Sequence, residues 1–78
     1  MPTVLRERGF RFFFWSNERN EPPHVHVESG DGFAKFWLSP VSLAESVNYD
    51  ASEVRQLWEI VTEHRDMFER VWHGYFGT

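Results

Sequence analysis

The sequence contains no cysteine and no long apolar run. The lack of cysteine excludes disulfides and thiol catalysis, and it fits a reducing compartment such as the cytoplasm. No stretch approaches the roughly 20 apolar residues that a membrane-spanning helix needs. The opening MPTVLRERG has charged side chains where a signal peptide would have its apolar segment. These absences predict a complete, soluble, cytoplasmic protein that does not associate with a membrane.

Positive charge is scarce as well. The formal net charge is −4, which disfavours general nucleic-acid binding because a phosphate backbone needs a basic surface. The charge is also unevenly distributed. Residues 1–20 carry four arginines against two glutamates, a net +2, whereas residues 21–78 carry four basic against ten acidic residues, a net −6. This asymmetry suits a charged partner, although scattered solvated charge is the more common explanation of such a distribution.

The 78 residues are enough for one domain, residues 1–78, with a thin margin of stability. Domains of this size rely on disulfides, a metal, a partner or rich packing. Aromatic residues make up 18% of the chain, more than so small a core readily hides. The composition therefore favours a surface that meets a partner.

Short β-type segments fill the first half of the chain. In FRFFFW, three phenylalanines share one face and Arg11, Phe13 and Trp15 share the other, a pattern typical of a central strand. Gly9 and the sequence SGDG indicate turns, SNERNEPP a loop, and Pro40 a strand end. We predict strands over residues 3–7, 10–15, 24–28 and 33–38, with a fifth over 41–46.

The second half is helical in pattern. Asp50 and Glu53 form a capping-box signature, and the chain is expected to bend near Arg65–Asp66. Apolar residues then recur at helical spacing and are assigned to the core: Val54, Leu57, Trp58, Val61, Phe68 and Trp72. The fold class is therefore α+β, with a small antiparallel sheet of four to five strands followed by one or two C-terminal helices packed on one face.

The stretch EPPHVHVES carries the main chemical signal. His24, His26 and Glu28 alternate onto one face of a strand, and the two histidines lie about 6.6 Å apart along it. This set predicts a candidate site for zinc or another divalent metal, with His64 or His73 as further ligands from the helix. The helix should cover the opposite, valine face of this strand, however, which separates His64 from the pair.

Other readings of the two histidines remain open. No motif requires a cofactor, and the histidines fit an open strand face without chemistry. Alternatively, His24, His26 and His64 are acid–base candidates for RNA cleavage, with Arg11 or Arg19 stabilising the phosphate. A structural reading lets His24 donate a hydrogen bond to the preceding loop and hold its path.

The residues described above resemble a small bacterial family known as domain of unknown function 4160. The similarity lies in MPTVLRERGFRFFFWSNERNEPPHVHVE, SGDG, SPVSLAES and EHRDMFERVWHGYFG. Members of that family have no assigned activity and are often encoded in pairs similar to toxin–antitoxin pairs. The resemblance implies that His24, His26, His64 and Trp72 stand at characteristic positions.

Two functions follow as hypotheses. The first is an interaction module of a toxin–antitoxin-like pair, which binds a cognate small protein or itself. Arg11, Trp15 and the helix end with Trp72 and Phe76 would contribute to its surface. The second is a small nuclease acting on RNA through the His24/His26 strand. The acidic net charge weighs against the second hypothesis.

Overall fold

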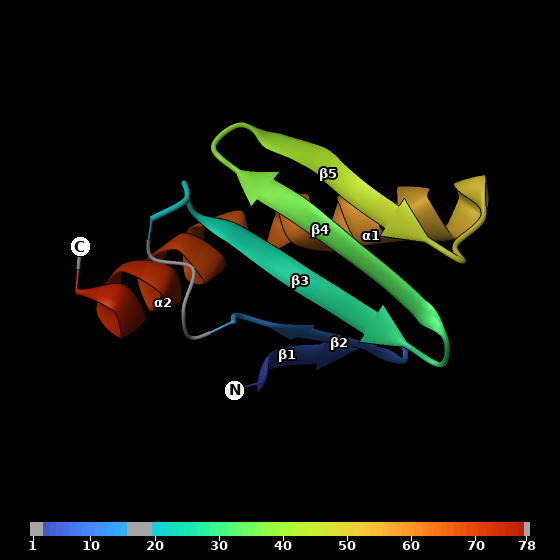
Figure 1. Ribbon diagram of the computed structural model, residues 1–78, viewed down its shortest axis with the longest axis horizontal. Helices are drawn as coiled ribbons and strands as arrows, with labels where there is room; N and C mark the ends of the chain where they lie inside the picture. Colours follow the sequence, from blue (N-terminus) through green and yellow to red (C-terminus); the bar gives the residue numbers. More distant parts are fainter. Residues whose placement is uncertain (1–2, 16–19, 78) are drawn as a thin grey trace.

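The computed structural model describes residues 3–15 and 20–77 and has the predicted α+β architecture. Five antiparallel strands follow one another in the order β1-β2-β3-β4-β5, and two helices complete the chain (Figure 1). The strands are β1 (Thr3–Glu7), β2 (Phe10–Phe13), β3 (His24–Ser29), β4 (Gly32–Leu38) and β5 (Val41–Val47), and the helices are α1 (Ala51–Glu63) and α2 (Arg65–Phe76). All five predicted strands and both helices are therefore present.

The tight turns lie where glycine permits them. Gly9 has φ +84° and follows Arg8 at φ +54°, so the β1–β2 hairpin uses two left-handed residues in succession. Gly30 has φ +53° in the β3–β4 turn. Both turns were predicted from sequence, and they make the sheet a simple meander in which neighbours in sequence are neighbours in space.

Cross-strand pairing separates the sheet into two faces. Phe12 pairs with Val27, whereas the adjacent Phe13 pairs with His26, so the predicted alternation in FRFFFW is confirmed. We call the face that packs on the helices the inner face, with Phe10, Phe12, Val25, Val27, Ala34, Phe36 and Leu38. The outer face carries Arg6, Arg11, Phe13, His24, His26, Glu28, Phe33, Lys35 and Trp37, and Trp15 continues it beyond β2. As predicted, β2 is an interior strand, flanked by β1 and β3.

The two helices lie on the inner face. In Figure 1, α1 runs behind β4 and β5, and α2 lies beside the start of β3. The predicted capping box is confirmed: Asp50 Oδ1 accepts from the Glu53 amide at 2.8 Å, and Glu53 Oε1 accepts from the Asp50 amide at 3.0 Å. The predicted bend occurs at His64, whose φ of −102° and ψ of 12° interrupt the helix one residue early.

The core between sheet and helices is entirely apolar. From the helices it receives Leu57, Ile60, Val61, Phe68, Trp72 and Phe76. Trp58 was predicted to join them, but its side chain is 42% exposed. Leu57, Ile60 and Val61 form the stripe that meets the sheet, which turns the adjacent Trp58 toward the sheet edge, 6.4 Å from the Phe36 ring. No helix in residues 3–15 and 20–77 is long and apolar enough to cross a membrane.

Candidate functional site

The outer face carries a cluster of six rings, which we call the ring cluster. Its members are Phe13, Trp15, His24, His26, Phe33 and Trp37. Ring centroids lie 5.6 Å apart for Phe13–His26, 5.0 Å for His24–His26 and 5.4 Å for His24–Trp37. These contacts join β2, β3 and β4 across the face that the helices leave open, so this face is packed rather than merely solvated.

His24 holds the loop that precedes β3. Its Nδ1 lies 2.8 Å from the carbonyl oxygen of Pro22, and since a carbonyl only accepts, the ring nitrogen donates. The predicted hydrogen bond from His24 to the loop is thereby confirmed. The His24 ring also lies 4.8 Å from the Trp72 ring of α2, which in turn contacts Phe14 at 5.3 Å. Trp72 thus links the ring cluster to the inner core at this end of the sheet.

His26 is buried within the cluster. Its ring stacks on Phe13 at 5.6 Å and on Phe33 at 6.0 Å, and the residue is only 4% exposed, while His24 is 0% exposed. The expectation that the two histidines lie on an open strand face is therefore wrong. The sequence of β3 alone does not show that the adjacent strands β2 and β4 place aromatic rings over its histidines. An RNA substrate would reach either ring only after the cluster had opened.

The predicted metal set of His24, His26 and Glu28 is not assembled. Glu28 is instead bound by Arg11, with 2.7 Å between Oε2 and Nη1. A different group has the spacing of metal ligands. Among residues 3–15 and 20–77, Glu7, Glu63 and His64 each place one possible ligand atom within 4.8 Å of the other two.

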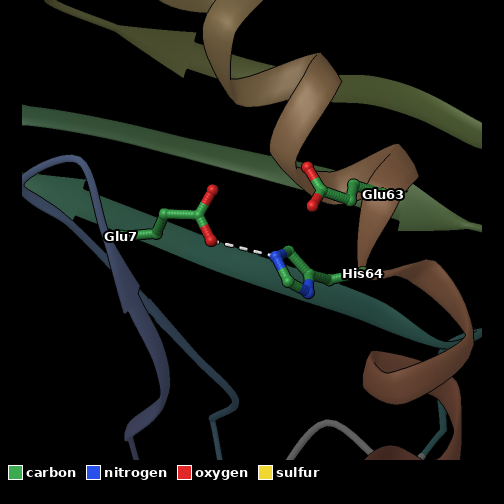
Figure 2. A group of neighbouring side chains, drawn as sticks. All are labelled: Glu7, Glu63 and His64. Carbon is green, nitrogen blue, oxygen red and sulfur yellow. Dashed lines mark hydrogen bonds and ion pairs between the residues drawn. The ribbon is translucent and has the colours of Figure 1, made fainter.

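His64, the third catalytic candidate, lies on the opposite side of the sheet from the histidine pair. It lies against the inner side of β1, where its Nε2 is 2.9 Å from Glu7 Oε1 (Figure 2). Glu7 and Glu63 were not among the predicted site residues. Glu63 directly precedes His64 at the expected helix bend, which is a local hint. Nothing in the sequence indicates Glu7, which stands 57 residues from His64.

Two cations lie over rings of the outer face, and each has an acidic partner. Arg11 lies 4.4 Å from the centroid of the Phe13 ring while it binds Glu28. Lys35 lies 4.5 Å from the centroid of Trp37, and its Nζ is 2.7 Å from Glu21. The phosphate-binding candidate Arg19 lies outside the described residues. Arg11 is thus already engaged by a carboxylate and an aromatic ring.

A shallow polar hollow lies beside the ring cluster, near the β1–β2 and β3–β4 turns. It is lined by Thr3, Arg6, Gly9, Arg11, Glu28, Ser29 and Gly30. Arg11 Nε donates a hydrogen bond to Thr3 Oγ1 at 2.8 Å. This bond fixes the guanidinium between the polar hollow and the ring cluster. The outer face therefore combines an aromatic area with a polar hollow at one end.

The four predicted partner-binding residues fall into two groups. Arg11 and Trp15 lie on the outer face, where Trp15 is 40% exposed. Trp72 and Phe76 are only 2% and 8% exposed and belong to the inner core, so the helix end does not present them as a surface. Their rings lie 4.2 Å apart, and both contact Phe14, which extends the inner face beyond β2.

Comparison with known proteins identifies a family and no closer precedent. Neither a curated protein nor a solved structure matches the chain. The model of one family matches residues 9–73, a range that contains β2 to β5, α1 and most of α2. The matched range also includes the ring cluster, the Pro22–His24 hydrogen bond and the helix bend at His64. The chain therefore belongs to the family described as Domain of unknown function (DUF4160).

Proposed function

We propose that this chain is an interaction module that binds a cognate small protein through its outer face, as one member of a toxin–antitoxin-like pair. The observation that carries the proposal is Trp15, which is 40% exposed and lies on a packed bed of rings, 5.7 Å from Phe13 and 5.9 Å from His26. The helices are packed on the other face, so this aromatic surface is left open to a partner.

The outer face has the make-up of a protein-binding surface. Binding energy concentrates in tryptophan, tyrosine and arginine residues near the centre of an interface, and a polar rim surrounds them. Here Trp15 and Trp37 provide the aromatic centre, and the Arg11–Glu28 and Lys35–Glu21 pairs provide the rim. The buried rings below Trp15 restrict its motion, which lowers the entropy lost on binding.

The polar hollow indicates the chemistry of the partner. Arg6 and Arg11 line it, and residues 1–20 as a whole carry a net +2. A partner segment that presents an apolar side chain to Trp15 and a carboxylate to Arg6 is complementary to this face. We therefore expect an acidic partner.

A nucleic acid is the weaker candidate for the same face, although its rings are suited to base stacking. Arg11 and Lys35 are each neutralised by a glutamate, and the chain carries a net −4. A phosphate backbone needs uncompensated positive charge along its path. The buried histidines likewise favour binding over RNA cleavage.

The test is a comparison of three baits in a lysate of the organism of origin. Wild type, Trp15→Ala and Trp58→Ala are immobilised, and retained proteins are quantified by mass spectrometry. Trp58 is the matched control, because it is 42% exposed but lies on α1 near the β5 edge. We expect a small acidic protein retained by wild type and Trp58→Ala, and reduced at least about tenfold by Trp15→Ala.

Other outcomes would contradict the proposal. Loss of the retained protein with Trp58→Ala alone would move the interface to α1 and β5. Light scattering during size-exclusion chromatography separates a cognate partner from self-association, since a dimer that Trp15→Ala dissociates would mean that the chain binds its own copy. Fluorescence anisotropy with single-stranded RNA should show no binding, and tight binding there would overturn the protein-partner proposal.

A further inference from the structure

We propose that Glu7, Glu63 and His64 form a binding site for one divalent metal ion of the zinc class. The site is on the helix side of the sheet edge, away from the outer face, so it stands independently of the proposed function. Figure 2 shows the three side chains converging from β1 and from the α1–α2 bend.

The geometry is close to that of a three-ligand site. One ligand atom from each of the three residues lies within 4.8 Å of the other two, and His64 Nε2 is 2.9 Å from Glu7 Oε1. A tetrahedral ion with bonds of about 2.0–2.1 Å needs donor atoms about 3.3 Å apart. Glu63 makes the remaining approach by side-chain rotation alone, because it is exposed and, among the described residues, has no hydrogen bond or ion pair.

The donor set selects the kind of metal. One imidazole nitrogen and two carboxylates suit zinc and its first-row neighbours, whereas magnesium and calcium prefer oxygen ligands alone. Three protein ligands leave a further position for water. Zinc is therefore the probe of choice, and magnesium the negative control.

The local charge favours a cation at this position. The guanidinium of Arg8 lies 3.9 Å from the carboxylate of Glu7 and 3.7 Å from that of Glu59, and the carboxylate of Glu63 lies close to Glu7 on the metal-site side. These four side chains carry a net −2, which a divalent ion would neutralise. Arg8 is held by exposed ion pairs alone, so it can move aside at small cost.

A bound ion would fasten the edge strand β1 to the helix bend. Glu7 and His64 are 57 residues apart, so the ion would close nearly the whole domain into a loop. A small domain without cysteine gains stability from such a cross-link. The consequence is a protein whose melting temperature depends on zinc.

Isothermal titration of untagged, chelator-treated protein with zinc chloride tests the proposal. We expect one equivalent to bind, Glu63→Gln to weaken binding at least about tenfold, and magnesium to show no binding. Glu63→Gln should fold normally because the exposed carboxylate has no hydrogen bond or ion pair within residues 3–15 and 20–77 to lose. Glu59→Gln, one turn earlier on α1, is the matched control and should change the affinity less than about twofold.

Two further readouts separate this site from binding elsewhere. Zinc should shift the side-chain nitrogen signals of His64 and leave those of His24 and His26 in place. At a hundredfold excess over the dissociation constant, zinc should raise the melting temperature of wild type by about 10 °C or more. Equal affinity of wild type and Glu63→Gln, or zinc-induced shifts at His24 and His26, would overturn the proposal.

Discussion

The two faces of the sheet bury their aromatic residues in different ways. Phe12 and Phe13 are neighbours in β2 and are 0% and 2% exposed, yet Phe12 lies in an apolar core and Phe13 lies against His26 and below Arg11. The inner face is closed by α1 and α2, whereas the outer face buries its rings against one another. The contrast teaches that the buried aromatic rings of the inner face stabilise the fold, whereas those of the outer face hold the exposed Trp15 in place.

The largest expected effect on stability comes from removing one buried phenylalanine ring from each face in turn. Phe12→Ala leaves a closed cavity and should lower the free energy of unfolding by about 3–5 kcal/mol. Phe13→Ala should cost less, about 2 kcal/mol, because Trp15 and Arg11 can collapse into the space and water can reach it. Urea denaturation of both variants measures the difference. Equal losses would mean that the outer face is a second closed core.

Substitutions at His24 test the junction of the two faces. His24→Ala removes the ring between His26 and Trp72 and the hydrogen bond to Pro22, and it should cost about 2–3 kcal/mol in unfolding free energy. His24→Asn is the matched variant, since its amide nitrogen can replace the Nδ1 donor. It should recover about 1 kcal/mol of the loss. No recovery would assign the stabilisation to ring packing alone.

Much of the fold was predictable because its signals are local. The alternation in FRFFFW, the turns at Gly9 and SGDG, and the Asp50–Glu53 cap each lie within a few residues of chain. The sites were less predictable because they depend on which strand lies beside which. The burial of His26 comes from Phe13 and Phe33 on the neighbouring strands.

Long-range placement explains the remaining errors. The Glu7–His64 contact requires the bend between α1 and α2 to lie against the edge strand β1, which no spacing in the sequence encodes. Trp58 satisfies a helical apolar stripe, yet the sheet is met by Leu57, Ile60 and Val61. Helical periodicity predicts which face of a helix is apolar, but it does not predict how much of that face the sheet covers.

The smallest expected effect concerns an ionisable group beside the inner core. Burial raises the pKa of Tyr49 above its ordinary value of 10.0, the Glu53 and Glu28 carboxylates add to the rise, and the hydrogen bond with Ser29 opposes it. The folded state therefore keeps the proton to higher pH than the unfolded state does. This contribution is fully present below pH 10 and is lost as pH rises through the folded-state pKa.

Tyr49→Phe isolates that contribution. The variant should lose a small amount of stability at neutral pH, about 1 kcal/mol, with the hydrogen bond to Ser29. Between pH 9 and pH 11, its unfolding free energy should fall less steeply than that of wild type, as followed by urea denaturation at each pH. A parallel decline in both proteins would show that Tyr49 ionises normally.

The four tryptophans offer the most direct test of the division between the faces. Trp15 and Trp37 belong to the outer face, Trp58 is exposed on α1, and Trp72 is buried in the inner core. The measurement is a nitrogen-15 spectrum of the indole N–H groups, recorded before and after addition of the captured partner. We predict that the Trp15 and Trp37 signals move while those of Trp58 and Trp72 stay in place. Movement of Trp58 with Trp15 unchanged would contradict the assignment of the outer face to binding.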